Sequence, residues 1–136
     1  MRDLFRRELI QGDSDGMNWT TIAIVVAVVV ALLLFKKVGQ ISAQSARELL
    51  AKGAVVIDVR TPAEFAGAHL KRAINIPLDQ VEAKVPLRVA GKATPILLHC
   101  ASGMRSGAAR SRLKSLGFTS VHNLGSYSRA AQIVEG

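Results

Sequence analysis

The chain has 136 residues, a formal net charge of +8 and an aromatic content of 4%. This length allows one domain of ordinary size. A basic chain can bind nucleic acid, but the few aromatic side chains and the absence of zinc-ligand spacings argue against it, and we expect neither nucleic acid nor a metal as a partner. Cys100 is the only cysteine, so no internal disulfide can form, and a free thiol favours a reducing compartment.

The first marked feature along the chain is an uncharged apolar run. Residues 19–35 (WTTIAIVVAVVVALLLF) contain no charged side chain. A helix of this length rises about 26 Å, against a hydrocarbon core of roughly 30 Å, and Trp19 suits a membrane interface. The sequence therefore predicts a transmembrane helix over residues 19–35, preceded by a tail of residues 1–18. A buried core element and a cleaved signal peptide are the alternatives.

The basic residues beside this run indicate an orientation. Lys36 and Lys37 follow it directly, which favours the cytoplasm for the C-terminal side. We therefore expect a single-pass protein of the cell membrane whose domain faces the cytoplasm. Met17 directly precedes the apolar run, so translation from Met1 and translation from Met17 both stay open.

Residues 36–40 are predicted as a linker to a folded domain over residues 41–136, in which helices and strands alternate. Ser42 is a suitable N-cap for the first helix, and Pro62 is a suitable first residue of the second. Further helices are predicted over residues 78–85 and 106–116 and after Gly125, with strands over residues 54–59, 73–77, 95–99 and 120–124. Short apolar strands separated by helices are typical of an α/β domain with a parallel sheet covered on both faces.

Cys100 lies where the third predicted strand ends, in the segment HCASGMRS. Ligands of parallel sheets bind beyond the C-terminal ends of the strands, and the N–H groups of this loop and of the next helix would form a cradle for an anion. The cradle would lower the pKa of the thiol and make Cys100 a nucleophile. We predict Cys100 as the catalytic residue, and as substrate-binding residues we predict Ala101, Ser102, Gly103, Met104 and Arg105. Arg105 can bind an oxyanion through its guanidinium fork.

Three groups of motifs in this domain resemble those of a known family. They are Val56-Ile57-Asp58-Val59-Arg60 with the later Glu64-Phe65, His69-Leu70, Ala73 and Asn75-Ile76-Pro77; Cys100-x-Ser102-Gly103-x-Arg105-Ser106; and Val121-His122-Asn123-Leu124-Gly125. From about Ile41 to the end, the chain is similar to the single-domain rhodanese-like sulfurtransferases. It departs from the family pattern at Ala68, Arg72, Ser126 and Tyr127, and none of these departures touches the nucleophile.

The resemblance implies a rhodanese-like fold and a thiosulfate sulfurtransferase activity that needs no cofactor. The Cys100 thiolate would take the outer sulfur of a small anionic donor such as thiosulfate, and the persulfide would pass it to an external acceptor such as cyanide or a thiol. Related phosphatases and arsenate reductases have a loop one residue longer than the four residues between Cys100 and Arg105, which makes them the weaker alternative. The other alternative is a non-catalytic rhodanese module that binds a partner at the membrane.

Polar residues outside the loop receive a structural interpretation. We expect Asp58, Arg60, Glu64 and His69 to tie the first strand to the helix and loop that follow it. His99 is adjacent to Cys100 on a strand, so its side chain should lie on the opposite face of the sheet. We therefore do not expect His99 to act as the base for the thiol.

Overall fold

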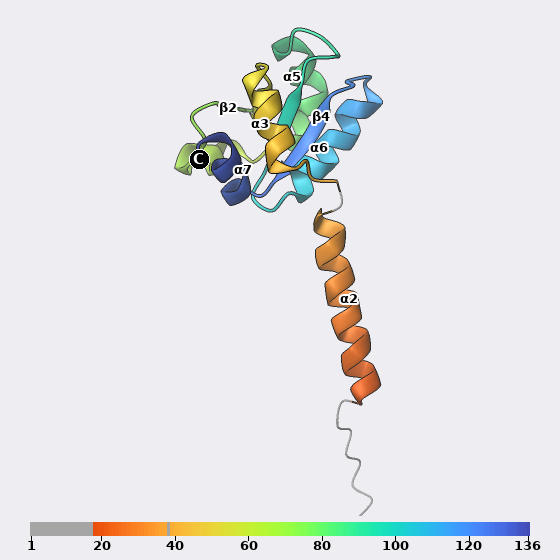
Figure 1. Cartoon of the computed structure of the whole chain (residues 1–136). Coiled ribbons are helices and arrows are strands. Elements are labelled where there is room, and N and C mark those ends of the chain that lie inside the picture. The colour runs from red at the N-terminus through yellow and green to blue at the C-terminus, as the bar shows by residue number, and fades with distance from the viewer. Residues whose placement is uncertain (1–17, 38) are drawn as a thin grey trace, which may run out of the picture. The chain divides into compact units, whose positions relative to one another are not determined.

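A computed structural model describes residues 18–37 and 39–136 of the chain (Figure 1). The predicted N-terminal tail, apart from Asn18, lies outside these residues, as do both candidate start methionines. The chain divides into two compact units, Met1–Phe35 and Lys36–Gly136. The two units are therefore described separately.

The apolar run folds as the helix α2, Trp19–Lys37. Its large aliphatic side chains are exposed in the structure; Ile24, for example, is 64% exposed and Leu32 61%. The expectation that residues 19–35 are helical is therefore confirmed. No helix within the described part of the chain is both long and apolar enough to cross a membrane, so the prediction of a transmembrane helix finds no support in the structure.

The second unit is an α/β domain around a parallel sheet. In chain order its elements are α3 (Ala43–Ala51), β1 (Val55–Asp58), α4 (Pro62–Gly67), β2 (Ala73–Asn75), the short 3-10 helix η1 (Leu78–Gln80), α5 (Val81–Arg88), β3 (Ile96–His99), α6 (Met104–Ser115), β4 (Val121–Gly125) and α7 (Tyr127–Val134). The four strands are all parallel, in the order β2-β1-β3-β4. This arrangement confirms the predicted α/β class and parallel sheet.

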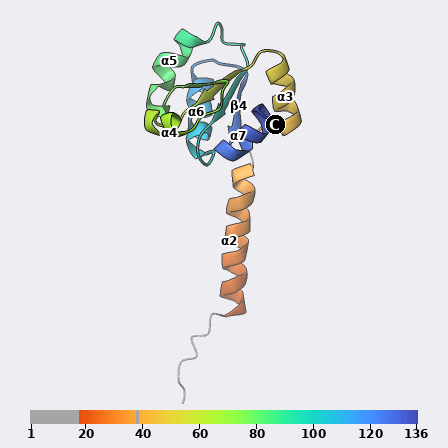
Figure 2. The ribbon, with the colours of Figure 1, turned by 90° about the vertical axis from the view of Figure 1, so that its left-hand side faces the viewer.

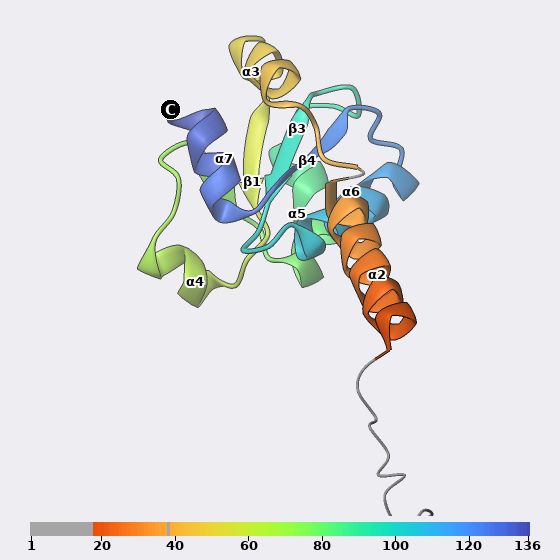
Figure 3. The ribbon, with the colours of Figure 1, turned by 60° about the horizontal axis from the view of Figure 1, so that its bottom comes forward.

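Helices cover both faces of the sheet, as the alternation of side chains along each strand requires. Ile57 and Leu98 lie on one face, in a core completed by residues of α5 and α6. Val56 and Leu97 lie on the other face, in a core completed by residues of α3 and α7. Figures 2 and 3 show these two helical layers on either side of the strands. The inner strand β3 is buried along its whole length.

Two predicted helices differ from the observed ones. The helix predicted over residues 78–85 is divided into η1 and α5, and α5 continues through Pro86 to Arg88. Pro86 removes one backbone donor, but the buried side chains of Val81 and Val85 hold the inner face of α5 against the core. The helix predicted from Ser106 begins at Met104, because Gly103 turns the chain directly into α6 with φ 96°.

The predicted structural network around the end of β1 is present for Asp58 and Arg60, whereas His69 contacts Phe65 of α4 instead. Asp58 is fully buried and accepts hydrogen bonds from the Arg60 backbone N–H and from the Arg60 guanidinium, the shortest at 2.7 Å. The same guanidinium donates to the Ala68 carbonyl at 2.7 Å, which ties β1 to the segment after α4. The His69 ring stacks on Phe65 and contacts its carbonyl. The fourth residue, Glu64, has a different partner, described below.

His99 is a fully buried histidine on the α7 side of the sheet. Neither ring nitrogen has a hydrogen-bond partner among the described residues, and the nearest carboxylate oxygen, from Asp58, lies 3.8 Å from Nε2. Burial lowers the pKa of His99 and outweighs the opposite influence of Asp58. The folded domain therefore holds this ring in its neutral form.

We expect His99→Leu to stabilise the domain, and to do so more at acidic pH. A buried polar group without a partner costs about 1–3 kcal/mol. In addition, the unfolded wild type binds a proton at His99 below about pH 6.5, whereas the folded form resists it, so the wild type loses stability as the pH falls through that value. Each unit by which folding lowers the pKa contributes about 1.4 kcal/mol to this loss.

The measurement is urea unfolding of both proteins, followed by circular dichroism, at about pH 8 and about pH 5. The free-energy difference between variant and wild type should widen at the acidic pH. Other titrating groups are common to both proteins and cancel in this difference. A difference that stays constant with pH would contradict the assignment of the acid sensitivity to His99.

Candidate functional site

Cys100 lies at the carboxyl edge of the sheet, directly after the last residue of β3. Its backbone N–H donates to the Gly125 carbonyl at 3.3 Å, which holds it beside the end of β4. Its side chain belongs to the core on the α5 and α6 side of the sheet. His99 lies on the opposite side, near Asp58, so the expectation that His99 is not placed to act as a base agrees with the geometry.

The loop after Cys100 brings backbone donors to the sulfur. The Gly103 N–H lies 3.0 Å from the Cys100 Sγ. Gly103 has φ 96°, and a Cβ atom added there would lie 3.1 Å from the Gly125 Cα. The turn and the close approach of the two backbones therefore both favour glycine at this position.

Ser106 and Asn123 complete the surroundings of the sulfur. The Ser106 hydroxyl oxygen lies 3.4 Å from Sγ and 2.7 Å from the Asn123 side-chain oxygen, so its single proton can be donated to either atom. The Asn123 amide in turn donates to the Gly103 carbonyl at 3.0 Å. The first turn of α6, the loop and β4 are thus joined by hydrogen bonds around Cys100.

These contacts determine the acidity of the thiol. Burial raises the pKa of Cys100, because a charged sulfur is costly away from water. Hydrogen bonds from the Ser106 hydroxyl and from the backbone N–H groups of Ser106, Gly103 and Ser102 stabilise the thiolate and together outweigh burial, so the pKa is lowered from its usual value. The backbone donors of the loop are therefore directed at the sulfur, and the Ser106 hydroxyl is an additional donor that the sequence analysis did not assign.

Arg105 lies in the first turn of α6, but its guanidinium fork is already engaged. Nη1 and Nη2 donate to the two carboxylate oxygens of Glu64, at 2.7 and 3.0 Å. The hydrogen bond with Arg105 is the main cause that lowers the pKa of Glu64 to about 2, with a smaller contribution from Thr61. In this structure a carboxylate of the protein therefore occupies the fork that the sequence assigned to an incoming oxyanion.

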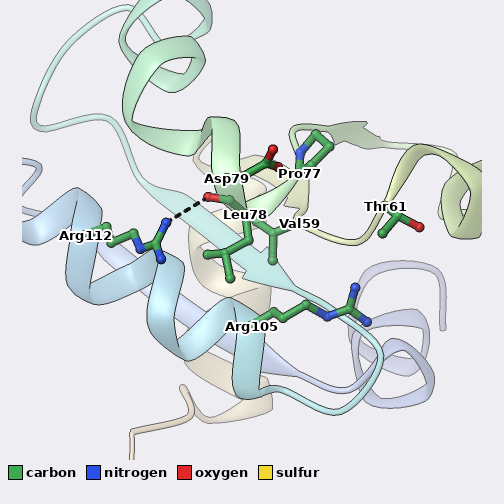
Figure 4. A pocket seen from close by; sticks show the side chains of 7 residues that line it. All are labelled: Val59, Thr61, Pro77, Leu78, Asp79, Arg105 and Arg112. Carbon is green, nitrogen blue, oxygen red and sulfur yellow. Dashed lines mark hydrogen bonds between the residues drawn. The ribbon is translucent and has the colours of Figure 1, made fainter.

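A hollow of about 230 Å³ adjoins Arg105 (Figure 4). It is lined by Val59, Thr61, Pro77, Leu78, Asp79, Arg105 and Arg112. The Arg112 guanidinium donates to the Leu78 carbonyl at 3.3 Å, as the dashed line in Figure 4 marks. The hollow therefore combines an apolar floor with two guanidinium groups, one of which belongs to the loop region of Cys100.

The structure brings together only part of the predicted substrate-binding set. The Gly103 N–H faces the sulfur, whereas the Ala101, Ser102 and Met104 side chains are exposed, Met104 by 71%. Ser102 contributes its backbone N–H to the sulfur. Across residues 18–37 and 39–136, no group of three or more His, Cys, Asp or Glu side chains is placed to hold a metal ion.

Two residues that contact the site received no role from the sequence. Ser106 is part of the motif around Cys100, and its place six residues after the nucleophile, on the following helix, was the available signal. Asn123 is separated from Ser106 by 17 positions, and only the fold brings them together. Glu64 was assigned to the network of Asp58, yet it contacts Arg105.

Comparison with known proteins agrees with this geometry. Residues 42–131 match the family described as rhodanese-like domain. The chain is 38% identical over 69 residues to the thiosulfate sulfurtransferase PspE of Escherichia coli, and the match covers 51% of this chain and 66% of PspE, just under two thirds of its length. It is 33% identical over 90 residues to the thiosulfate sulfurtransferase GlpE of Pseudomonas fluorescens, covering 66% of this chain and 78% of that protein.

Comparison with a solved structure also points to a rhodanese-like relative. The human single-domain sulfurtransferase TSTD1 superposes with a TM-score of 0.58 at 29% identity, over 69% of this chain and 96% of the human one. The parallel sheet, the loop after β3 and these similarities point to one family. The chain therefore belongs to the rhodanese-like domain family and is related to thiosulfate sulfurtransferases.

Proposed function

We propose that this chain is a sulfurtransferase that moves a sulfane sulfur from thiosulfate, or a similar small anion, to an external acceptor through a persulfide on Cys100. The observation that carries the proposal is the sulfur of Cys100, which has a lowered pKa and is surrounded by the Gly103 N–H and the Ser106 hydroxyl. A thiolate is the nucleophilic form of cysteine. The relatives named thiosulfate sulfurtransferase support the choice of donor.

The first step is a nucleophilic displacement at sulfur. The Cys100 thiolate attacks the outer sulfur of thiosulfate, a new S–S bond forms, and the original S–S bond breaks with its electron pair leaving on sulfite. The negative charge then rests on the outer persulfide sulfur. The loop donors that stabilise the thiolate are fixed in place before the reaction, which is how preorganised donors lower a barrier.

The second step returns the enzyme to its starting state. An acceptor such as cyanide or a thiolate attacks the outer sulfur of the persulfide, and the electron pair of the broken S–S bond returns to Cys100. Because Cys100 is the only cysteine in this chain, no neighbouring thiol of the same chain can take the sulfur. The acceptor therefore has to come from outside the chain.

We also propose that α2 attaches the chain to a lipid membrane and that the domain faces the cytoplasm. The support for attachment is the exposed aliphatic surface of the helix: Val26 is 55% exposed and Leu33 58%. A helix that is apolar on all sides is unfavourable in water. The support for the orientation is the pair Lys36 and Lys37 in the sequence.

The purified full chain should gain about 32 Da, the mass of one sulfur atom, when thiosulfate is added, and should lose it to cyanide with release of thiocyanate. Intact-protein mass spectrometry measures the first change and a colorimetric thiocyanate assay the second. Cys100→Ser should show neither. If the wild type forms no persulfide while its thiol stays reduced and titratable, the transfer reaction is contradicted and a partner-binding module becomes the better account. Turnover of a phosphate ester would instead favour the phosphatase alternative.

Ser106→Ala should move the pH dependence of persulfide formation to higher pH. The change removes the hydroxyl that stabilises the thiolate, so the pKa of Cys100 rises and a higher pH is needed for the same fraction of thiolate. The measurement is the initial rate of persulfide formation across a pH series. Asn123 keeps its hydrogen bonds to the backbone of Gly103 and Gly125 in this variant, so the loop should stay in place. An unchanged pH midpoint would show that Ser106 does not set the acidity of the thiol.

Membrane attachment is measured by flotation of the reconstituted full chain with phospholipid vesicles. The wild type should float with the vesicles, and Val26→Lys should reduce flotation, because a charged side chain on the apolar surface of α2 is costly to remove from water. Leu87→Lys is the matched control, since Leu87 is an 82% exposed residue of the folded domain. Equal flotation of Val26→Lys and Leu87→Lys would contradict attachment through α2.

The orientation is tested with a membrane-impermeant thiol reagent. This reagent should leave Cys100 unmodified in intact cells and should modify it in permeabilised ones.

A further inference from the structure

The ion pair between Glu64 and Arg105 lies beside the loop of Cys100, because Arg105 directly precedes Ser106, whose hydroxyl contacts the sulfur. Glu64 belongs to α4 and Arg105 to α6, and their side chains are each 35% exposed, whereas Cys100 is fully buried. Arg105 lies in the chain between Gly103 and Ser106, which both contact the Cys100 sulfur. The pKa of Arg105 is raised, first by its hydrogen bond to Glu64 and to a smaller extent by the charge of the Cys100 thiolate. An anion bound beside Cys100 therefore experiences the charges of both members of this ion pair.

The carboxylate of Glu64 is held firmly in position. Besides the two bonds from Arg105, its Oε1 accepts hydrogen bonds from the Thr61 backbone N–H at 3.2 Å and from the Thr61 hydroxyl at 3.1 Å. Thr61 in turn caps α4, so the pair forms a capping box. Glu64 therefore keeps a negative charge beside Arg105 without needing a bound ligand to place it.

This charge opposes the binding of the donor that the proposed function requires. Arg60, another guanidinium near the end of β1, is engaged by the buried Asp58. The attraction of Arg105 for an anionic ligand is offset by the negative charge of Glu64, whose carboxylate lies 2.7 Å from the guanidinium. Because a Coulomb interaction is proportional to the ligand charge, the repulsion by Glu64 is twice as large for a dianion as for a monoanion in the same position.

We infer that Glu64 is a specificity-determining residue that makes the site discriminate against dianionic sulfur donors relative to monoanionic ones. The inference rests on the proposed sulfur transfer and adds to it the charge class of the preferred donor. A monoanionic thiosulfonate carries the same transferable outer sulfur as thiosulfate with one negative charge fewer. Glu64 selects between the two while Cys100 performs the same displacement on both.

Glu64→Gln isolates the charge from the structural role of this side chain. Glutamine has nearly the same shape as glutamate and is itself a standard residue at this position of a capping box. Its side-chain carbonyl can still accept from Thr61 and from one nitrogen of Arg105. The variant therefore removes one negative charge and keeps the cap of α4.

The test compares two donors on the reduced full chain, with persulfide formation followed by intact mass. Thiosulfate releases sulfite, and methanethiosulfonate releases methanesulfinate, so the same product forms on Cys100 from a dianion and from a monoanion. Glu64→Gln should raise the second-order rate constant for thiosulfate by about two- to fivefold, the range of an exposed charge pair. For methanethiosulfonate, which carries half the charge, the change in energy should be half as large, so its rate constant should rise by about the square root of that factor.

A second comparison does not depend on sulfur transfer. Iodoacetate and iodoacetamide alkylate a thiolate by the same displacement of iodide, but only iodoacetate is charged. Glu64→Gln should raise the rate of alkylation of Cys100 by iodoacetate relative to the rate by iodoacetamide. The control is Glu48→Gln, which removes a charge from an exposed residue of α3, a helix that lies away from α4 in Figures 2 and 3. It should change neither the rate ratio of the two sulfur donors nor the rate ratio of the two alkylating reagents.

The outcomes separate this inference from the proposed function. If persulfide forms with both donors but Glu64→Gln changes the two rates by the same factor, or lowers the thiosulfate rate, the charge selection is wrong and sulfur transfer stands. If no persulfide forms with either donor, the proposed function fails, and the alkylation ratio then decides the inference alone. If Glu64→Gln shows the same ratio of iodoacetate to iodoacetamide alkylation rates as the wild type, the selection of donors by the charge of Glu64 is overturned.

Discussion

The side-chain amide of Asn123 connects the nucleophile loop to the sheet. Its nitrogen donates to the Gly103 carbonyl at 3.0 Å, and its oxygen accepts from the Gly125 N–H at 2.8 Å and lies 2.7 Å from the Ser106 hydroxyl oxygen. One side chain thus fixes the turn before α6, the hydroxyl beside the sulfur and the end of β4. The donors around Cys100 are aimed at it before any ligand arrives, which is the condition for electrostatic preorganisation.

The sheet separates two buried groups that are neighbours in the sequence. His99 and Cys100 are consecutive, yet they lie on opposite faces. At His99 burial is the largest influence and outweighs the opposing charge of Asp58, so the pKa of the ring falls. At Cys100 four hydrogen bonds outweigh burial and stabilise the charged form. Two consecutive buried side chains on opposite faces of the sheet therefore differ in charge: His99 is held neutral, whereas the anionic form of Cys100 is favoured.

The sequence was sufficient for the features that depend on local pattern. Continuous apolar runs identify β1 and β3, because a parallel strand is buried on both faces. The thiol after β3 marks the site, because ligands bind at that edge of a parallel sheet. The start of α6 was missed by two residues, since it depends on the positive φ of Gly103, which the sequence does not reveal.

Contacts between distant segments could not be predicted in the same way. The partner of Arg105 is 41 positions away, and Glu64 was assigned instead to Asp58 and Arg60, its neighbours along the chain. The contact of Ser106 with Asn123 likewise depends on how α6 packs beside β4. The pattern of each segment gives its own secondary structure, whereas these pairings require the three-dimensional arrangement of several segments.

The placement of the nucleophile and of the ion pair has a consequence for local stability. Cys100 follows β3, an inner strand that is hydrogen-bonded on both sides and buried throughout, whereas Glu64 belongs to the six-residue helix α4, which has no buried residue. Short exposed elements open at lower free energy than core strands. Amide exchange in α4 should therefore be faster than in β3, and each opening of α4 releases Glu64 from Arg105 while the backbone of Cys100 stays folded. The carboxylate charge beside Arg105 thus fluctuates independently of the nucleophile.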